Sequence, residues 1–139
     1  MGRTAIGTFL LVAGVGSVVL AQSHVHTESL LKNLPRPRGS TAVSITLAPN
    51  AVGQKALQYQ VQMAPEPALQ FFRQVLTQQG YVERPANTIS GVWGFSLVFD
   101  PPATVNLKPR VPGKTVVLVC QGTVTAPQTL TISARFEEI

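Results

Sequence analysis

The chain has 139 residues, which is enough for one domain of ordinary size and leaves little room for a second core. Its 11 basic and six acidic residues give a formal net charge of +5, and apolar residues make up 45% of the chain. The single cysteine, Cys120, excludes an intramolecular disulfide, so the domain must be held together by core burial.

The first 21 residues have the three parts of a secretory signal peptide. Arg3 gives a positively charged start, residues 4–20 carry no charged side chain, and Val19-Leu20-Ala21 presents small or modest side chains to a signal peptidase. The sequence therefore predicts cleavage after Ala21 and a periplasmic or secreted protein without a permanent membrane span.

An uncleaved membrane anchor is the alternative for this segment, because about 18 uncharged residues is close to the shortest stretch that crosses a bilayer. The glycines and hydroxyl side chains spread through residues 4–17 weaken a permanent span. We therefore expect cleavage, with a membrane-anchored chain as the second interpretation.

Residues 22–40 are expected to form a basic, proline-containing tail or linker outside the domain. They show no sustained period of apolar residues, and Pro35 and Pro37 favour extended backbone. Lys32, Arg36 and Arg38 give this segment a positive charge that would attract anionic surfaces such as lipid headgroups. A solvated tail that only aids solubility is the plainer interpretation.

The predicted mature chain begins Gln22-Ser23-His24, which places an imidazole at its third residue. A free amine, two backbone amides and that imidazole offer four nitrogens in one plane, which suits Cu(II) or Ni(II). His26 would be a further ligand. The alternative is that both histidines are incidental residues of the tail.

From Thr41 apolar residues alternate with polar ones, which predicts two antiparallel strands that each have one wet face. Their apolar positions are Val43, Ile45 and Leu47, and then Leu57, Tyr59, Val61 and Met63. The period then becomes helical over residues 65–80. The apolar stripe of this expected helix is Ala68, Leu69, Phe72, Val75 and Leu76.

Three further strands are predicted. Residues 93–99 place Trp93, Phe95, Leu97 and Phe99 on one face; residues 116–119 are apolar on both faces; residues 130–136 alternate again. A proline-stiffened loop over residues 100–113 precedes the second of them. The order ββαβββ predicts one α+β domain over residues 41–139, with a mainly antiparallel sheet of four or five strands and one helix on one face.

No catalytic set emerges from the sequence. Both histidines lie in the expected tail, so Cys120 has no base nearby, and its position on a doubly apolar strand predicts a buried packing residue. The carboxylates are too scattered for a paired mechanism, and the few cations lie mainly in the tail, which disfavours nucleic-acid binding. A non-enzymatic protein is therefore favoured, and its oligomeric state is not predicted.

The leading hypothesis is an exported domain that contacts an envelope protein or an anionic surface through its wet sheet face and its proline-rich loop. Gln58, Gln60 and Gln62 supply hydrogen-bonding groups on that face. The alternative is a small ligand-binding protein or enzyme with a cleft between the 100–113 loop and the sheet, lined by Trp93, Asp100 and Arg110. Trp93 is a stacking platform in that alternative, whereas burial in the core is its expected role otherwise.

Overall fold

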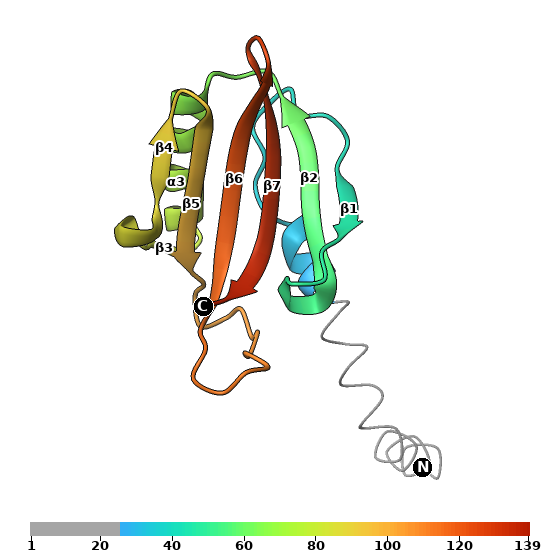
Figure 1. The fold of residues 1–139 in the computed structure, drawn as a ribbon, viewed down its shortest axis with the longest axis vertical. Helices are drawn as coiled ribbons and strands as arrows, with labels where there is room; N and C mark the ends of the chain where they lie inside the picture. The colour runs from blue at the N-terminus through green and yellow to red at the C-terminus, as the bar shows by residue number, and fades with distance from the viewer. Residues whose placement is uncertain (1–25) are drawn as a thin grey trace, which may run out of the picture.

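The computed structural model describes residues 26–139, which build an antiparallel sheet with two helices behind it (Figure 1). Seven strands make up the sheet: β1 (Ser44–Leu47), β2 (Lys55–Val61), β3 (Val82–Glu83), β4 (Ile89–Gly91), β5 (Gly94–Asp100), β6 (Val116–Ala126) and β7 (Thr129–Glu138). The helix α3 (Pro65–Gln78) follows β2, and a short helix over residues 26–32 precedes β1. Two 3-10 turns lie between the strands of the described residues, η1 (Val52–Gln54) and η2 (Pro85–Asn87).

The strands lie in the order β1-β2-β7-β6-β5, and the two short strands β3 and β4 both pair with the outer edge of β5. All of these pairings are antiparallel. The expected α+β class with an antiparallel sheet is therefore confirmed. The expected number of strands is wrong, because β3 and β4 are too short and too exposed to produce a readable alternation.

The residues at both ends of α3 explain where this helix begins and ends. Pro65 occupies the first turn, where its missing amide hydrogen costs no helical bond, and Glu66 lies near the positive end of the helix dipole. Beyond the helix, Gly80 has φ 93°, and the amide of Tyr81 donates to the carbonyl of Leu76. The predicted apolar stripe faces the sheet, with Leu69, Phe72 and Leu76 almost fully buried.

The main core lies between the sheet and the two helices. The alternating residues of the strands point into it, among them Tyr59, Phe95 and Phe136. The helix α3 contacts β5 and β6, while Leu34 and Pro35 approach Leu57 on the other half of the sheet. Each half of this sheet face is therefore covered by a different segment (Figure 1).

The segment expected to be a linker differs from that expectation over its described residues. Residues 26–32 are helical, Thr27 and Leu31 are fully buried, and Leu34 is 9% exposed. The described residues of this helix, 26–32, place only Leu31 among the fully buried leucines, which is too few to show a repeating period. It is stabilised by packing rather than by its own propensity, which sequence patterns do not register.

Trp93 also departs from its expected place. The strand begins at Gly94 rather than at residue 93, and Trp93 lies in the β4–β5 turn with 44% of its surface exposed. Gly94 has φ 136°, which breaks the alternation that would otherwise carry Trp93 onto the same face as Phe95.

Among residues 26–139, no helix is long and apolar enough to cross a membrane. The predicted signal peptide lies outside the described residues.

Candidate binding site

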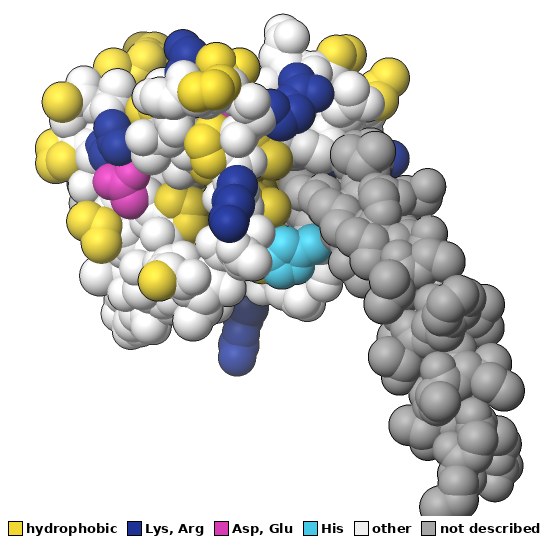
Figure 2. Space-filling model, turned by 90° about the horizontal axis from the view of Figure 1, so that it is seen from below, with side chains coloured by type: hydrophobic (Ala, Val, Ile, Leu, Met, Phe, Trp, Pro, Cys, Tyr) yellow, Lys and Arg dark blue, Asp and Glu magenta, His cyan; other side chains and the backbone are white. Residues whose placement is uncertain are grey.

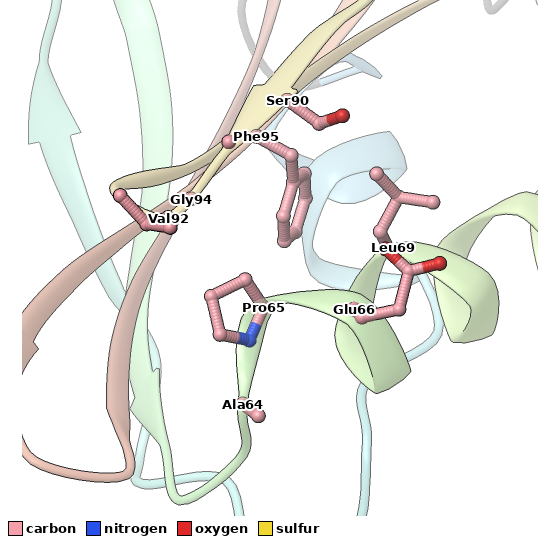
Figure 3. Close-up of a pocket in the computed structure, with 9 residues that line it drawn as sticks. Ala64, Pro65, Glu66, Leu69, Ser90, Val92, Gly94 and Phe95 are labelled. Atoms are coloured by element: carbon pink, nitrogen blue, oxygen red, sulfur yellow. The ribbon is translucent and has the colours of Figure 1, made fainter.

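A groove of about 510 Å³ lies between the start of α3 and the turn that joins β4 to β5 (Figure 3). Its lining comes from three short stretches of chain: Ala64, Pro65, Glu66 and Leu69; Ser90, Gly91 and Val92; Gly94 and Phe95. Pro65, Leu69 and Phe95 approach one another across it, as Figure 3 shows. The groove is therefore mainly apolar, with Glu66 and Ser90 as its polar side chains.

The helix side of the groove is fixed by the first turn of α3. The N-cap residue Ala64 makes no side-chain capping bond, and Glu66 is exposed and accepts a hydrogen bond from Gln70 Nε2 at 3.0 Å. Leu69 is only 3% exposed, because its side chain also belongs to the core. This wall thus consists of Leu69 from the core, the half-buried Ala64 and Pro65, and a single carboxylate at its rim.

The turn on the other side is held tightly against the sheet. Gly91 and Gly94 form the last β4–β5 pair, and the carbonyl of Trp93 accepts a hydrogen bond from the amide of Val124 at 2.9 Å. A Cβ on residue 91 would lie 2.9 Å from Trp93 Nε1, so the indole ring covers Gly91. The backbone of the tip is therefore anchored, the Val92 side chain points into solvent and the Trp93 ring lies back over Gly91.

Large apolar side chains are unusually exposed around this turn. Val92 is 96% exposed, Ile89 61%, Trp93 44% and Val124 40%. We call these four residues and the groove together the hairpin-tip site. Val92 borders the groove, whereas Ile89, which pairs with Ser96, and Trp93, which covers Gly91, lie on the other side of the hairpin. Exposed apolar groups gathered on one turn are typical of an interaction surface rather than of ordinary solvated protein.

The opposite face of the sheet, which we call the open face, carries the polar positions of the strands. A row of uncharged polar residues crosses it, one from each of β1, β2, β7, β6 and β5: Ser44, Gln58, Ser133, Gln121 and Ser96. Gln60 lies beside Thr131 in the next row, and Gln62 follows the end of β2. The three glutamines proposed as contact residues are exposed, as a wet sheet face requires.

Part of the open face is occupied by its own hydrogen bonds. Arg135 Nη1 donates to Gln121 Oε1 at 2.9 Å, Gln121 Nε2 donates to Ser96 Oγ at 3.4 Å, and Arg135 also pairs with Glu137 at 3.2 Å. Val98, Val117 and Val119 form a small buried cluster on the same face. These groups are engaged within the sheet and are less available to a partner.

The structure does not bring Trp93, Asp100 and Arg110 into one cleft. Trp93 precedes β5 and Asp100 ends it, so a strand of about 20 Å separates them. Asp100 accepts a hydrogen bond from Arg84 Nε at 2.8 Å. Arg110 is exposed on the loop, and its backbone amide donates to Glu138 Oε1 at 2.5 Å.

The residues proposed to bind copper or nickel lie mostly beyond the described structure. Gln22, Ser23 and His24 fall outside residues 26–139; His26 lies in the short helix, and its Nε2 is buried without a hydrogen-bond partner. Within the described part of the chain, no group of three or more His, Cys, Asp or Glu side chains is placed to hold a metal ion.

Cys120 is a packing residue, as its position on a doubly apolar strand predicts. It is 2% exposed on the helix face of β6, and burial raises the pKa of its thiol to about 12. Burial also raises the pKa of Tyr59 and of Tyr81 above the usual range. These groups stay protonated at neutral pH and belong to the core.

The hairpin-tip site was only partly visible in the sequence. The sequence offered Trp93 as a candidate contact residue, but the groove depends on two segments about 25 residues apart meeting in space. Comparison of the chain with models of known protein families, with curated proteins and with solved structures finds no match.

Proposed function

We propose that the protein is an exported, non-enzymatic domain that binds an apolar stretch of a partner protein at the hairpin-tip site. The observation that carries the proposal is the turn itself, which holds Val92 outward at the lip of an apolar groove and leaves Trp93 half-exposed over Gly91 beside it. Aromatic and aliphatic side chains presented on a fixed backbone supply contact area at a low entropic cost.

The edge of the sheet favours an extended segment as the occupant. Among the described residues, β4 pairs only with β5, so its outer edge is open to a further strand. A peptide that adds to this edge would lie beside the groove and could place an apolar side chain between Pro65 and Val92.

A small ligand is the second candidate for the groove. Its volume falls within the range of small-molecule sites, but such sites usually have several converging polar groups, and here only Glu66 and Ser90 offer polar side chains. The open sheet face, where the sequence led us to expect contacts, is less favoured because Gln121 and Arg135 already bond within it.

Site-specific photocrosslinking in cells tests the proposal. With a photoreactive residue in place of Val92, we expect a defined crosslinked product, and with the same residue at the exposed helix position Gln74 we expect none. Trp93→Ser should lower the yield from position 92 on the order of tenfold, as loss of a central aromatic contact does. Equal products from both positions, or a yield that is unchanged by Trp93→Ser, would contradict the assignment of the site.

The export part of the proposal has a separate test. Mass spectrometry of the protein recovered from each cell fraction should find a chain that begins at Gln22 in the periplasm or medium. An intact chain found only in the cytoplasm would rule export out.

The same mature protein can be titrated with Cu(II) to test the proposed site at Gln22, Ser23, His24 and His26. A square-planar d-d absorption band that is lost in His24→Ala supports that site. Absence of the band removes the metal hypothesis and leaves the hairpin-tip site unaffected.

A further inference from the structure

Ion pairing leaves an uneven set of charges on the described part of the chain. Four pairs are formed: Lys32 with Glu28, Arg73 with Glu83, Arg84 with Asp100, and Arg135 with Glu137. The side-chain cations of residues 26–139 without a carboxylate partner are Arg36, Arg38, Lys55, Lys108, Arg110 and Lys114. The acidic side chains of these residues that lack a cationic partner are Glu66 and Glu138. Six cations and two carboxylates are therefore outside ion pairs.

The topology gathers four of these cations at one end of the sheet, which is the lower end in Figure 1. Lys55 begins β2 and pairs with Leu47 at the end of β1. Lys108, Arg110 and Lys114 lie on the loop over residues 101–115, which leaves β5 and enters β6 at that same end. Thr115 closes the loop through two backbone hydrogen bonds with Ile139, each 2.8 Å long.

The loop is anchored at its base and exposed at its tip. Val105 and Leu107 are partly buried against the main core, whereas every residue from 108 to 115 is exposed. The three loop cations are therefore carried outward by a segment whose start is fixed to the domain.

Exposed apolar side chains lie among these cations. Leu47 is 74% exposed, Val111 48% and Ile139 43%, and all three belong to the same end of the sheet. Figure 2 looks onto this end and shows Lys and Arg side chains interspersed with hydrophobic ones and little acidic surface. Cations with apolar side chains among them suit a lipid surface, which has negatively charged headgroups outside and apolar chains beneath. A soluble acidic polymer has no such apolar layer.

The beginning of the described chain lies at this end too. A Cβ on Gly53, in the turn before β2, would come within 2.6 Å of Thr27 Oγ1, so the short helix over residues 26–32 packs beside the start of β2. In the sequence, the uncharged apolar stretch over residues 4–20 comes shortly before this helix. A chain held in the membrane by that stretch, before or without cleavage, would have this end of the domain nearest to the lipid.

We propose that the lower end, defined as Leu47, Lys55, residues 108–115 and Ile139, is a surface that rests on anionic phospholipid headgroups. The cations attract the phosphates, and Val111 and Leu47 reach the apolar boundary below them. This surface lies at the other end of β5 from the hairpin-tip site, and neither proposal depends on the other.

Matched double variants test the surface. The loop sequence Lys108-Pro109-Arg110 has a counterpart in Arg36-Pro37-Arg38, whose segment leads away from the lower end, since Thr41 bonds to Gln60 near the far end of β2. Both Lys108→Gln/Arg110→Gln and Arg36→Gln/Arg38→Gln remove two positive charges. Each variant is expressed from the full coding sequence and purified in whichever form, cleaved or intact, accumulates in its cells.

The measured quantity is the ratio of binding to vesicles that contain phosphatidylglycerol over binding to pure phosphatidylcholine vesicles. Dividing the ratio of each variant by that of the parent cancels the contribution of residues 1–25, which all of them share. Each cation at the membrane surface contributes about a fivefold preference for anionic vesicles. The ratio should therefore fall roughly 25-fold in Lys108→Gln/Arg110→Gln and less than about threefold in Arg36→Gln/Arg38→Gln. Equal losses in the two doubles, or no loss in either, would overturn the proposal.

Fluorescence distinguishes lipid contact from attraction by charge alone. An environment-sensitive dye on Val111→Cys should shift to the blue with phosphatidylglycerol vesicles, because residue 111 would meet the apolar boundary. The emission of Trp93, the single tryptophan of the chain, should not shift, since it lies at the opposite end. Binding without a shift at residue 111, or with a shift at Trp93, would overturn the assignment of the lower end to lipid.

Discussion

Gly94 lies so close to Gly122 on the neighbouring strand that a Cβ on residue 94 would collide with the carbonyl oxygen of Gly122. Gly94 also has φ 136°, a backbone conformation that side chains with a Cβ rarely adopt. The hairpin-tip site thus depends on a backbone contact that only glycine permits.

Gly94→Ala should therefore destabilise the fold by about 3 kcal/mol, from strain and from displacement of β5 away from β6. Gly113→Ala is the matched control: it also has positive φ, at 84°, but nothing lies within 4 Å of its added Cβ. The control should cost about 1 kcal/mol. Equilibrium denaturation in urea measures both, and equal losses would show that the contact with Gly122 is not tight.

The short N-terminal helix is expected to be part of the cooperative fold. Leu31 is fully buried in the main core, so Leu31→Ala should lower the free energy of unfolding by about 3 kcal/mol. Leu30→Ala, at a partly buried position of the same helix, should cost about 1 kcal/mol. Denaturation monitored by far-ultraviolet circular dichroism checks this, and a Leu31→Ala variant as stable as the parent would mean that the segment is a detached linker after all.

The pair between Arg73 and Glu83 makes stability depend on acid pH. Arg73 Nε and Nη2 donate to the two carboxylate oxygens of Glu83 at 2.7 and 3.0 Å, and this hydrogen bonding, helped by Thr88, lowers the pKa of Glu83 below 4.5. A carboxylate with a lowered folded-state pKa stabilises the fold above its unfolded pKa and loses that contribution as the pH falls.

Glu83→Gln should cost about 1 kcal/mol at pH 7, a modest figure because the Arg73 side chain is 38% exposed. The difference between the variant and the parent should shrink as the pH falls below about 4.5. Glu66→Gln, at an exposed carboxylate bonded only to Gln70, serves as the control and should change stability by less than about 0.5 kcal/mol. A Glu83→Gln deficit that stays constant down to pH 3 would contradict this account.

The thiol of Cys120 should react only when the protein opens. Its pKa of about 12 and its burial leave almost no accessible thiolate at pH 8, so we expect labelling at least about 1,000-fold slower than in denaturant. The variant Val92→Cys gives an exposed reference that should label quickly in the folded protein. Comparable rates at the two positions would show that the β6 strand opens readily.

Periodicity predicted the parts of the fold in which one residue type repeats. Leu57, Tyr59 and Leu69 were assigned to apolar faces from their spacing alone, and all three are buried in the core. Periodicity gave no prediction where too few apolar residues follow one another to repeat. Leu31 and Leu34 are two core contacts in a single helical turn and its exit, and the exposed strand β4 has no apolar alternation to read.

The candidate site was less predictable because it is defined by distance in space. Gly91 and Gly94 flank Trp93 in the sequence, which marks a tight turn, but nothing there shows that this turn meets Pro65 at the start of α3. The lower end has the same origin. Lys55 and Lys108 lie at the same end of the sheet because β2 begins there and β5 ends there.

The long strands of the sheet join the hairpin tip directly to the end where the described chain begins. A pull between Trp93 and Thr27 would run along these strands and obliquely from β5 to the start of β2, while their hydrogen bonds lie across them. Bonds loaded in this way must give way together in shear rather than peel apart one after another. A domain held at the lower end and pulled at its hairpin tip would therefore resist that pull through the pairings between β2, β7, β6 and β5.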